Sequence, residues 1–383
     1  MSRSPSNPAW GNPPWEIDFE PQRREIPGHV DFAVVGGGFS GLSAASFLRR
    51  YAPNKTTAVF EAGRVGAGSS GHTGGMALAE SAAGKLPGLG DVLKGLKEIH
   101  RELQLDSDLH LRGAWELGRT NITRNSPLAW NDSGALGVVK KIPGGTLDPG
   151  KQVSSLARAA QRSGAYIFEN TGVEKISFEQ PRTLHLPRKR ISAGRILIAT
   201  NAESLELNNF TNSGESKFTL ALATAPLTDK QLQAIGLSLH LPFYTLDMPY
   251  LWGRRFHNRQ VIFGSGLVQL NHWSELNTLN ISTGEPATLM RLLESRVRSL
   301  HPALKKVAFT NRWGGPIFIT NDWIPIFRQH PQSKNVIVLG GYSGHGVALS
   351  VYLGRWAAKA LLGKRKLPSW NKSSGKKSSG AKR

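Results

Sequence analysis

Apolar runs that end in glycine clusters dominate the chain, and the first of them opens a recognisable unit. Val30–Val35 is an almost continuous apolar run, typical of a strand buried on both faces. Three glycines follow, and apolar residues then recur at helical spacing over Phe39–Tyr51, shortly before Pro53. Thr57–Phe60 is a second short apolar run. The pattern predicts a strand, a tight turn, a helix and a second strand, joined by a right-handed crossover.

The same alternation continues as far as residue 362 and ends in another strand, glycine and helix sequence. Helices are predicted at Asp91–Leu103, Lys151–Ser163, Thr288–Leu300 and Val347–Leu362. Strands are predicted at Tyr166–Phe168, Val173–Phe178, Thr183–Leu186, Arg195–Thr200, Tyr250–Trp252, Val261–Phe263 and Asn335–Leu339. A chain of 383 residues exceeds what one compact core usually holds, so two domains or one large α/β unit are expected.

Composition narrows the chemistry. The chain has no cysteine, which excludes disulfides, thiolate metal sites, cysteine nucleophiles and a cysteinyl cofactor link. No segment approaches the roughly 18 uncharged apolar residues of a membrane span, and the polar start shows no signal region. We therefore expect a soluble, cytoplasmic protein without a membrane span.

Positive charge is concentrated in two places. The 48 Lys and Arg against 27 Asp and Glu give a net charge of +21, and residues 364–383 hold eight of the cations without an acid. Arg182–Arg195 is a second basic run. A solvated loop and a disordered, solubilising tail explain both. Contact with nucleic acid or another polyanion is the alternative, although Trp370 is the tail's one aromatic residue, which argues against a nucleic-acid arm.

The glycines after the first strand have the spacing of a dinucleotide-binding turn. Gly36, Gly38 and Gly41 form GxGxxG, in which the first makes the turn, the second admits a pyrophosphate and the third lets helix pack on strand. The following helix N-terminus offers amide donors to the phosphates. Glu61, at the end of the second strand, suits a ribose diol and repels a 2′-phosphate. Strand, turn, helix and acid together predict dinucleotide binding.

Two further segments favour a flavin over a nicotinamide. Gly66–Gly75 offers many amides and hydroxyls along an extended cofactor beyond its pyrophosphate. Gly340–Gly346 is a second junction between a strand and a helix, whose N-terminus directs positive potential at an acceptor, as a reduced anionic flavin requires.

These pieces resemble a known family. DFAVVGGGFSGLSAA, FEAGRVGAGSSGHTGGMAL, RILIATNAE, RWGGPIFITNDWIPIF and VIVLGGYSGHGVALS follow the order found in the FAD-dependent D-amino-acid oxidase superfamily, with the glycine/sarcosine oxidase-like and γ-glutamylputrescine oxidase-like branch the most similar. The resemblance implies an α/β fold, with a Rossmann-like FAD-binding domain interleaved with a mixed-sheet (α+β) substrate domain. It also implies hydride removal from a carbon beside an amine nitrogen, which gives an imine that hydrolyses.

The resemblance places domain limits and cofactor contacts on the chain. The expected segments are an extended arm (1–28), an FAD-binding domain (29–85, 146–215 and 318–366), a substrate domain (86–145 and 216–317) and a disordered basic tail (367–383). The expected FAD contacts are Gly36, Gly37, Gly38, Phe39, Ser40, Gly41, Glu61, Ala62, Arg64, Ser69, Ser70, Gly71, His72, Thr73, Gly74, Gly75, Met76, Val173, Thr200, Gly340, Gly341, Tyr342, Gly344, His345, Gly346 and Val347.

Two features leave the chemistry open. His72 is similar in spacing to a histidine that bonds covalently to flavin in dimethylglycine and sarcosine dehydrogenases, yet Gly71 replaces the preceding tryptophan, so a non-covalent neighbour is the alternative. Sarcosine-type oxidases place a cation where this chain has Val268, and a carboxylate-binding lysine where it has Ala348. The sequence therefore leaves open whether the electrons pass to dioxygen or to another acceptor.

Substrate residues are predicted around Asp247–His257. Alternation places Tyr250, Trp252 and Arg254 on one face, and an arginine between aromatics suits a carboxylate-bearing amine, although an outward-facing stack is the alternative. With His345 and His272, Tyr250 and Arg254 are the candidate catalytic residues. The predicted substrate is a small amine or amino acid; oxidation of a tRNA base side chain and FAD binding without catalysis are the competing hypotheses.

Overall fold

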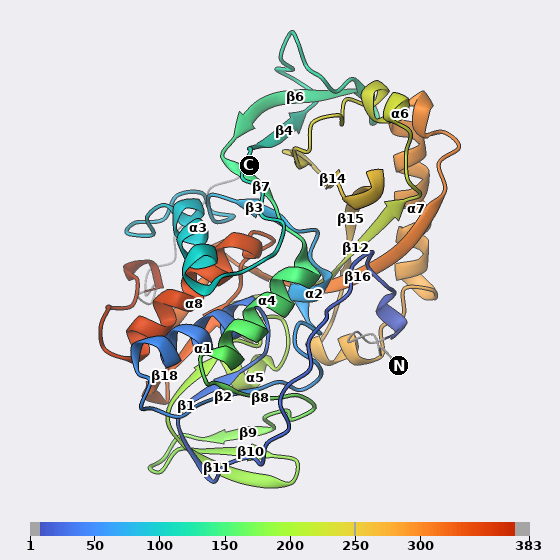
Figure 1. The fold of residues 1–383 in the computed structure, drawn as a ribbon. Helices are drawn as coiled ribbons and strands as arrows, with labels where there is room; N and C mark the ends of the chain where they lie inside the picture. Colours follow the sequence, from blue (N-terminus) through green and yellow to red (C-terminus); the bar gives the residue numbers. More distant parts are fainter. Residues whose placement is uncertain (1–7, 249, 372–383) are drawn as a thin grey trace.

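The computed structural model describes residues 8–248 and 250–371 (Figure 1). Most of the tail that was predicted to be disordered, residues 372–383, lies outside the described residues, as do the first seven residues of the arm. The chain forms two bodies, each built on an eight-stranded sheet, and a two-stranded sheet of β3 and β7 lies near their junction. No helix of the described part is long and apolar enough to cross a membrane.

The first sheet is the predicted parallel one. Its order is β17, β18, β11, β1, β2 and β8, with the hairpin of β9 and β10 attached to β11. The strands β18, β11, β1, β2 and β8 are parallel, and β17 is antiparallel at the edge. The bounds are β1 His29–Val35, β2 Thr57–Phe60, β8 Tyr166–Phe168, β9 Lys175–Ser177, β10 Thr183–Leu186, β11 Lys189–Ile198, β17 Ile326–His330 and β18 Ser333–Gly340.

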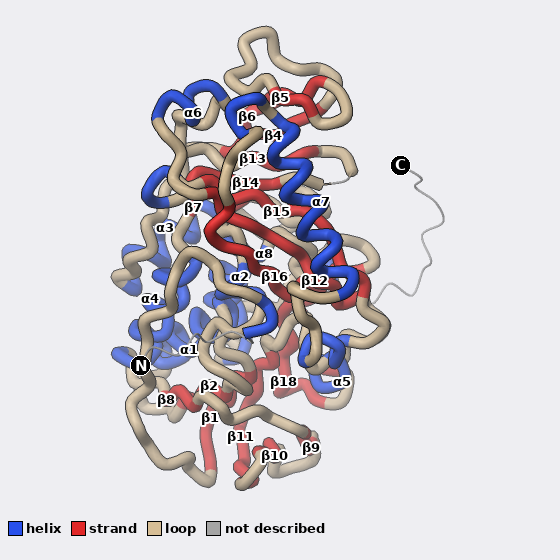
Figure 2. Tube along the Cα trace, turned by 90° about the vertical axis from the view of Figure 1, so that its right-hand side faces the viewer, coloured by secondary structure: helices blue, strands red, loops and turns tan. Residues whose placement is uncertain are grey.

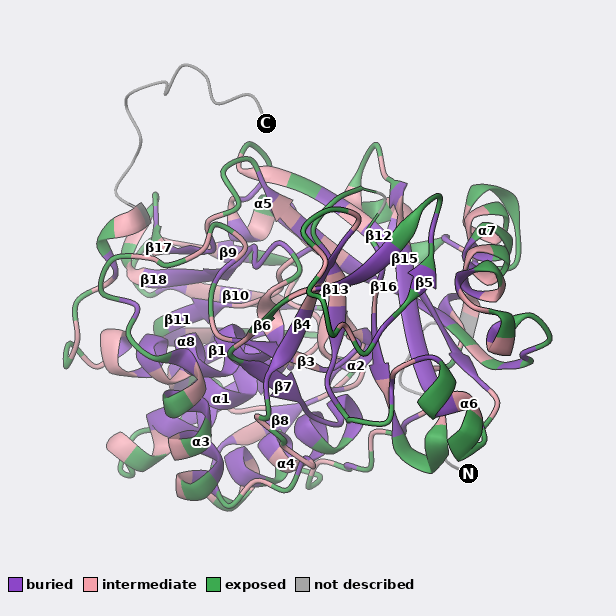
Figure 3. Cartoon of the chain, turned by 90° about the horizontal axis from the view of Figure 1, so that it is seen from above, coloured by how far each residue is buried: buried purple, intermediate pink, exposed green. Residues whose placement is uncertain are grey.

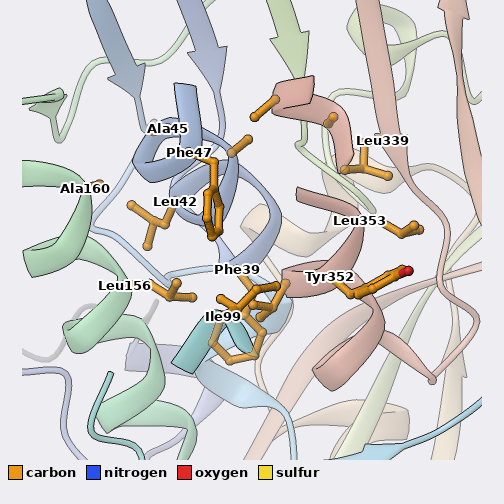
Figure 4. Close-up of a cluster of buried hydrophobic side chains, with 14 of the residues drawn as sticks. Phe39, Leu42, Ala45, Phe47, Ile99, Leu156, Ala160, Leu339, Tyr352 and Leu353 are labelled. Atoms are coloured by element: carbon orange, nitrogen blue, oxygen red, sulfur yellow. The ribbon is translucent and has the colours of Figure 1, made fainter. Parts of the chain in front are cut away.

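Helices cover one face of this sheet. They are α1 Phe39–Tyr51, α3 Val92–Leu103, α4 Pro149–Arg162 and α8 Gly346–Leu361. Figure 4 shows the core that they share, with Phe39, Leu42 and Phe47 of α1 among side chains of α4, α8 and β18. The helices α1 and α8 approach closely because a Cβ on Gly354 would lie 2.6 Å from the carbonyl oxygen of Ser40. This packing places the first turn of α1 against the middle of α8.

The second sheet is mixed, as predicted for the other body. Its order is β16, β12, β15, β14, β13, β4, β6 and β5, and β13 with β4 is its one parallel pair in the described chain. The bounds are β4 Ala114–Gly118, β5 Trp130–Asn131, β6 Ala135–Ile142, β12 Gly214–Thr224, β13 Phe243–Thr245, β14 Trp252–Arg255, β15 Val261–Gln269 and β16 Phe309–Thr320. The helix α7, Gly284–Leu300, packs on β12 and β15 and runs along the outer side of this body (Figure 2).

Short elements complete the chain. They are α2 Ser69–His72, α5 Leu205–Asn208, α6 Asp229–Ala234, β3 Met76–Leu78, β7 Gly144–Thr146 and the 3₁₀ turns η1 Pro8–Trp10, η2 His257–Arg259, η3 Trp273–Asn277, η4 Pro302–Leu304 and η5 Ser369–Asn371. Seen from above, buried residues fill the two sheets and the helices α1 and α8, whereas α6 and α7 present exposed residues (Figure 3).

The N-terminal arm is extended, as expected, but it is anchored rather than simply laid on the surface. Trp10, Trp15 and Phe19 are all buried. The indole nitrogen of Trp15 donates to the carbonyl oxygen of Gly71 at 2.8 Å, and that of Trp10 donates to Leu276. The arm therefore joins the two bodies.

The domain limits stay a prediction, and several elements cross them. The strand β12 begins at Gly214 and β16 ends at Thr320, so both strands run past the expected limits at 215/216 and 317/318. The helix α3 was assigned to the substrate segment, yet it packs on α8 of the first body. Hydrophobic pattern locates elements well, but the body that each element joins depends on non-local packing.

Candidate functional site

A cavity of about 2290 Å³ lies between the two bodies. Its first wall comes from the β1–α1 turn, the segment around α2 and the β18–α8 turn, and its second wall comes from β12, β14, β15 and β16. The carboxyl ends of the parallel strands β1 and β18 face it, which is where open α/β sheets bind ligands.

The glycines of the β1–α1 turn are required by their surroundings. Gly36 has φ +105°, a conformation that side chains rarely adopt. A Cβ on Gly41, in the first turn of α1, would collide with the carbonyl oxygen of Gly36, so only glycine fits at this position. Gly38 lies in the cavity wall, and a Cβ there would lie 2.8 Å from the hydroxyl of Ser70 and occupy part of the wall. The backbone is thus open to a ligand that approaches it directly.

Two longer helices begin at this wall without a side-chain cap. The N-cap of α1 is Gly38 and that of α8 is His345, and neither makes a side-chain capping hydrogen bond. The amide of Phe39 donates to the hydroxyl of Ser70 at 3.0 Å. The other first-turn amides and the positive ends of both helix dipoles face the cavity. Such a pair of termini attracts phosphate groups and other electron-rich groups.

Two carboxylates lie deep in the first wall. Glu61 accepts hydrogen bonds from the amides of Gly37 at 2.6 Å and Gly63 at 2.9 Å, and burial nevertheless raises its pKa. Burial, and then the negative charge of Glu61, raise the pKa of Glu203 to about 7. Glu61 keeps the position that sequence predicted for a ribose-binding acid, whereas Glu203 was missed because it follows Ala202 in an irregular turn with no motif.

His72 lies at the end of α2 with its ring closed in by protein. Its Nδ1–H donates to the carbonyl oxygen of Gly68 at 2.9 Å, and Trp10 packs edge-on against the ring. Its Nε2 is buried and has no hydrogen-bond partner in the described structure. Burial lowers the pKa of His72, so the ring is neutral near pH 7.

Asn201 connects three segments of the cavity wall, and sequence reasoning missed it. Its amide nitrogen donates to the hydroxyl of Ser69 at 3.1 Å, and its oxygen accepts from the amide of Gly341 at 2.8 Å. The hydroxyl of Ser69 in turn donates to the carbonyl oxygen of Pro316. These hydrogen bonds connect α2, the β18–α8 turn and β16. Asn201 lies in the RILIATNAE segment, which marks the family resemblance but does not by itself indicate this role.

Aromatic side chains form much of the second wall. Tyr250 and Trp252 line the cavity, as sequence alternation predicted for them. Trp252 contacts two glycines, Gly74 of the first body and Gly264 of β15. Its indole occupies the space that a Cβ on either glycine would need. Thr219, Lys217, Ser265, Leu267 and Tyr244 also line this wall and were not singled out from the sequence.

The cavity gathers most of the expected FAD contacts. In its wall lie Gly36, Gly38, Phe39, Ser40, Glu61, Ser69, Ser70, His72, Thr73, Gly74, Met76, Thr200, Tyr342, Gly344, His345, Gly346 and Val347. Outside the wall lie Gly37, Gly41, Ala62, Arg64, Gly71, Gly75, Val173, Gly340 and Gly341. Several of these second residues support the wall from behind, as Gly37 does through its bond to Glu61.

Of the four candidate catalytic residues, two do not reach the cavity. Arg254 lies behind the Gly74–Gly75 backbone: its Nε donates to the carbonyl oxygen of Gly74 at 2.6 Å, and its guanidinium stacks on Phe256. His272 is exposed, pairs with Glu206 at 3.1 Å and caps η3 through Ser274. Neither lines the cavity, so the contact with substrate that sequence predicted for both is corrected. The alternation of a strand predicts on which face Arg254 lies, but it does not predict that the Gly74–Gly75 backbone covers that side chain.

His345 and Tyr250 do line the cavity. Burial lowers the pKa of His345, which lies at the N-terminus of α8. Beside it, Tyr342 donates to or accepts from the hydroxyl of Ser40 at 2.6 Å, which joins the starts of α8 and α1. His345 is therefore neutral near pH 7 and does not act as a charged proton donor in this part of the wall.

The sequence profile of a family described as FAD dependent oxidoreductase matches residues 31–360. The chain belongs to this family. The resemblance to the D-amino-acid oxidase superfamily is therefore confirmed, and with it FAD as the cofactor of the family.

Curated relatives cover most of the chain. The γ-glutamylputrescine oxidoreductase of Escherichia coli K12 is 26% identical over 87% of this chain and 84% of its own length. The glycine oxidase of Bacillus subtilis is 22% identical over 89% of this chain and 95% of its own. This chain is thus similar to enzymes that act on amines and amino acids.

Solved structures share the fold. Glycine oxidase from Geobacillus kaustophilus superposes with a TM-score of 0.69 at 19% identity, over 88% of this chain and 96% of its own. L-proline dehydrogenase from P. horikoshii gives a TM-score of 0.69 at 19% identity, over 90% of this chain and 96% of its own. The expected combination of an FAD-binding body with a mixed-sheet body is confirmed.

The residues of the first wall fit FAD. Gly38 leaves the backbone open where a pyrophosphate approaches, the uncapped N-termini of α1 and α8 supply amide donors, and Glu61 presents a carboxylate to a ribose. An elongated cofactor would then run from Glu61, past Gly38 and Ser70, towards Thr73 and the β18–α8 turn.

Proposed function

We propose that the protein oxidises the C–N bond of an amine or amino acid at the second wall of this cavity. When bound, FAD supplies the electron acceptor for a hydride leaving the carbon beside the amine nitrogen. The resulting imine hydrolyses to a carbonyl compound and a released amine or ammonia. The electrons then pass to dioxygen or another acceptor.

One observation carries this proposal. The glycine-rich wall that fits FAD faces an aromatic wall across a single cavity, so a cofactor and an amine would lie within the same chamber. Tyr250 and Trp252 offer flat surfaces that pack against an amine's carbon chain and keep water away from it. Trp252 also touches Gly74, so the two walls are fixed relative to each other.

The polar groups of the chamber suit a neutral amine. Burial lowers the pKa of His345, so the ring is uncharged near pH 7 and does not repel an approaching ammonium group. The neutral ring can also accept the proton that the ammonium group must lose before hydride transfer. Lys217 brings a cation to the wall that Arg254 does not reach, and its Nζ pairs with the carboxylate of Glu215 at 3.1 Å. We infer that Lys217 takes the role proposed for Arg254 when a substrate bears a carboxylate.

The relatives named above support neither oxidation of a tRNA side chain nor FAD binding without catalysis. Product analysis tests the proposal. The purified holoenzyme is incubated with amines and amino acids and an artificial acceptor, and the expected products are the matching carbonyl compound and an amine or ammonia in equal amounts. Carbonyl formation without nitrogen release, or oxidation of alcohols alone, would contradict C–N bond oxidation.

A further inference from the structure

We propose that the mouth of the cavity is a second recognition site, which binds an anionic group carried by the substrate at the far end of an aliphatic chain from its amine. The inference rests on the proposed function and names its substrate class. The cavity supports it by extent: ligand pockets commonly hold about 300–1,000 Å³, and this one, which would hold both FAD and substrate, measures about 2290 Å³. Beyond the glycine-rich wall it continues between the 78–97 segment and residues 111–116 and 140–144.

Six exposed cationic side chains line this outer part. They come from the loop before α3, from α3 itself, from the turn before β4 and from β6: Lys85, Lys94, Lys97, Arg112, Lys140 and Lys141. Within residues 8–248 and 250–371, no carboxylate pairs with any of the six side chains. Some cations elsewhere are paired, as Arg296 is with Asp132 and Arg355 with Glu98; what sets the six apart is that they line one cavity. A group of unpaired cations that faces one opening provides a site for an anion.

The acids at the mouth do not neutralise these cations. Glu80, Asp91 and Glu116 also line the outer cavity. The side chain of Asp91 caps α3 by accepting from the amide of Lys94, and that of Glu116 accepts from the hydroxyl of Tyr244 at 2.8 Å. Two of the three acids are therefore already engaged, and the mouth keeps an excess of positive charge.

Apolar side chains line another part of the mouth. Leu246, Met248, Tyr250 and Trp323 all line the cavity although they are 50%, 64%, 41% and 42% exposed. Large exposed apolar groups around an opening are typical of a binding surface. Trp323 also has φ +63°, a conformation uncommon for a residue with a side chain, so the turn holds its indole out at the rim at a local cost.

The two sets of side chains fit one kind of molecule. An aliphatic spacer would lie against Tyr250, Met248 and Trp323, with its amine in the inner chamber and its carboxylate among the cations of the mouth. A glycine-sized substrate would reach none of these outer groups. Because exposed ion pairs are weak and screened, each cation contributes only about two- to fivefold to binding, and several act together.

A matched substrate series tests the proposal. The holoenzyme is assayed with 4-aminobutanoate, 6-aminohexanoate and 8-aminooctanoate, and with butylamine, hexylamine and octylamine, which lack the carboxylate. For the longer spacers, the carboxylated amine should show the higher kcat/KM, through a lower KM, and added salt should erase the advantage. The Lys140→Gln/Lys141→Gln variant should lower kcat/KM for 8-aminooctanoate about five- to twentyfold and leave octylamine unchanged.

The control variant is Lys305→Gln/Lys306→Gln, a second pair of adjacent exposed lysines away from this cavity. It should leave both series unchanged. Binding of octanedioate to the FAD-loaded enzyme, followed by calorimetry, gives a readout that needs no turnover; the Lys140/Lys141 variant should weaken it several-fold and the control should not.

The outcomes separate the two proposals. Equal loss on carboxylated and uncarboxylated amines, or octanedioate binding that the Lys140/Lys141 variant leaves unchanged, overturns the anion site. If no amine or amino acid, within these series or outside them, reduces the flavin, the proposed function fails, and the octanedioate titration still decides whether the mouth binds anions.

Discussion

Gly38 is the residue at which the cofactor's approach depends most simply on the absence of a side chain. It lies in the cavity wall at the start of α1, and even a Cβ there would lie 2.8 Å from the hydroxyl of Ser70. Gly38→Val should therefore abolish flavin binding, because its methyl groups project where the pyrophosphate meets the backbone. The ratio of flavin to protein absorbance measures the effect. Gly28→Val is the control, since nothing lies within 4 Å of a Cβ at Gly28.

His72 decides whether the cofactor is bonded to the chain. Its Nδ1–H donates to the carbonyl oxygen of Gly68, and its Nε2 is buried by protein atoms. Neither nitrogen is therefore accessible to a flavin, so we predict a non-covalent cofactor. Acid precipitation of the purified protein should release all of the flavin into the supernatant. Flavin that stays with the precipitate, and is lost in His72→Ala, would show a histidyl link instead.

Glu203 should make stability depend on pH. Burial raises its pKa from 4.5 to about 7 in the folded protein. The stability contributed by its protonated form is present below the unfolded pKa and is lost as pH rises from about 4.5 to about 7. Glu203→Gln should thus stabilise the protein by roughly 1–3 kcal/mol at pH 8 and have little effect at pH 4.5.

Thermal unfolding midpoints of the purified protein at both pH values measure this effect. The exposed Glu206 is the control, because its pKa is lowered, through its hydrogen bonds to Trp273 and His272 among other causes. Glu206→Gln should not stabilise the protein at pH 8. A Glu203→Gln variant with the same midpoint shift at both pH values would contradict the assignment.

Among the elements, the N-terminal arm has the largest effect beyond its own length. Trp15 packs edge-on against Trp313 and Phe256 of the second body, and its indole nitrogen donates to the carbonyl oxygen of Gly71 in α2, the helix at the cavity wall. Trp15→Ala should cost about 3–5 kcal/mol of stability and speed flavin loss. Trp15→Phe keeps most of the apolar contact and should lose less. Chemical unfolding and the rate of flavin release measure both; an unchanged release rate in Trp15→Ala would mean that the arm does not support the site.

The elements of the first sheet were largely predictable from sequence, and those of the second sheet were not. The strand β1 and helix α1 follow the predicted runs closely because a buried parallel strand reads as a continuous apolar segment. The strand β14 begins only at Trp252, and β4 and β6 were not predicted. These strands are stabilised by contacts with the cavity and with neighbouring strands, which leave no clear local pattern in the sequence. At Val268, too, the sequence did not give the direction of the side chain. The side chain of Val268 lies in the hydrophobic core of the second body, whereas that of its neighbour Leu267 lines the cavity.

At the scale of the whole molecule, the site exists only because the two bodies face each other. Sequence motifs located most of the first wall, since glycine turns and uncapped helix starts have a recognisable spacing. The second wall depends on which strands lie above the cofactor and on the loop that covers Arg254, and neither has a local signal. The mouth, likewise, brings together cations from separate segments between residues 85 and 141.

The central claim is that an amine gives a hydride to FAD in this cavity. Anaerobic rapid mixing of the holoenzyme with an amine that it oxidises, and with the same amine carrying deuterium on the carbon beside nitrogen, tests it most directly. The account predicts bleaching of the flavin without dioxygen, slowed several-fold by deuterium. A flavin that stays oxidised with every amine and amino acid, or bleaching at one rate for both isotopes together with recovery of the unchanged amine, would contradict it.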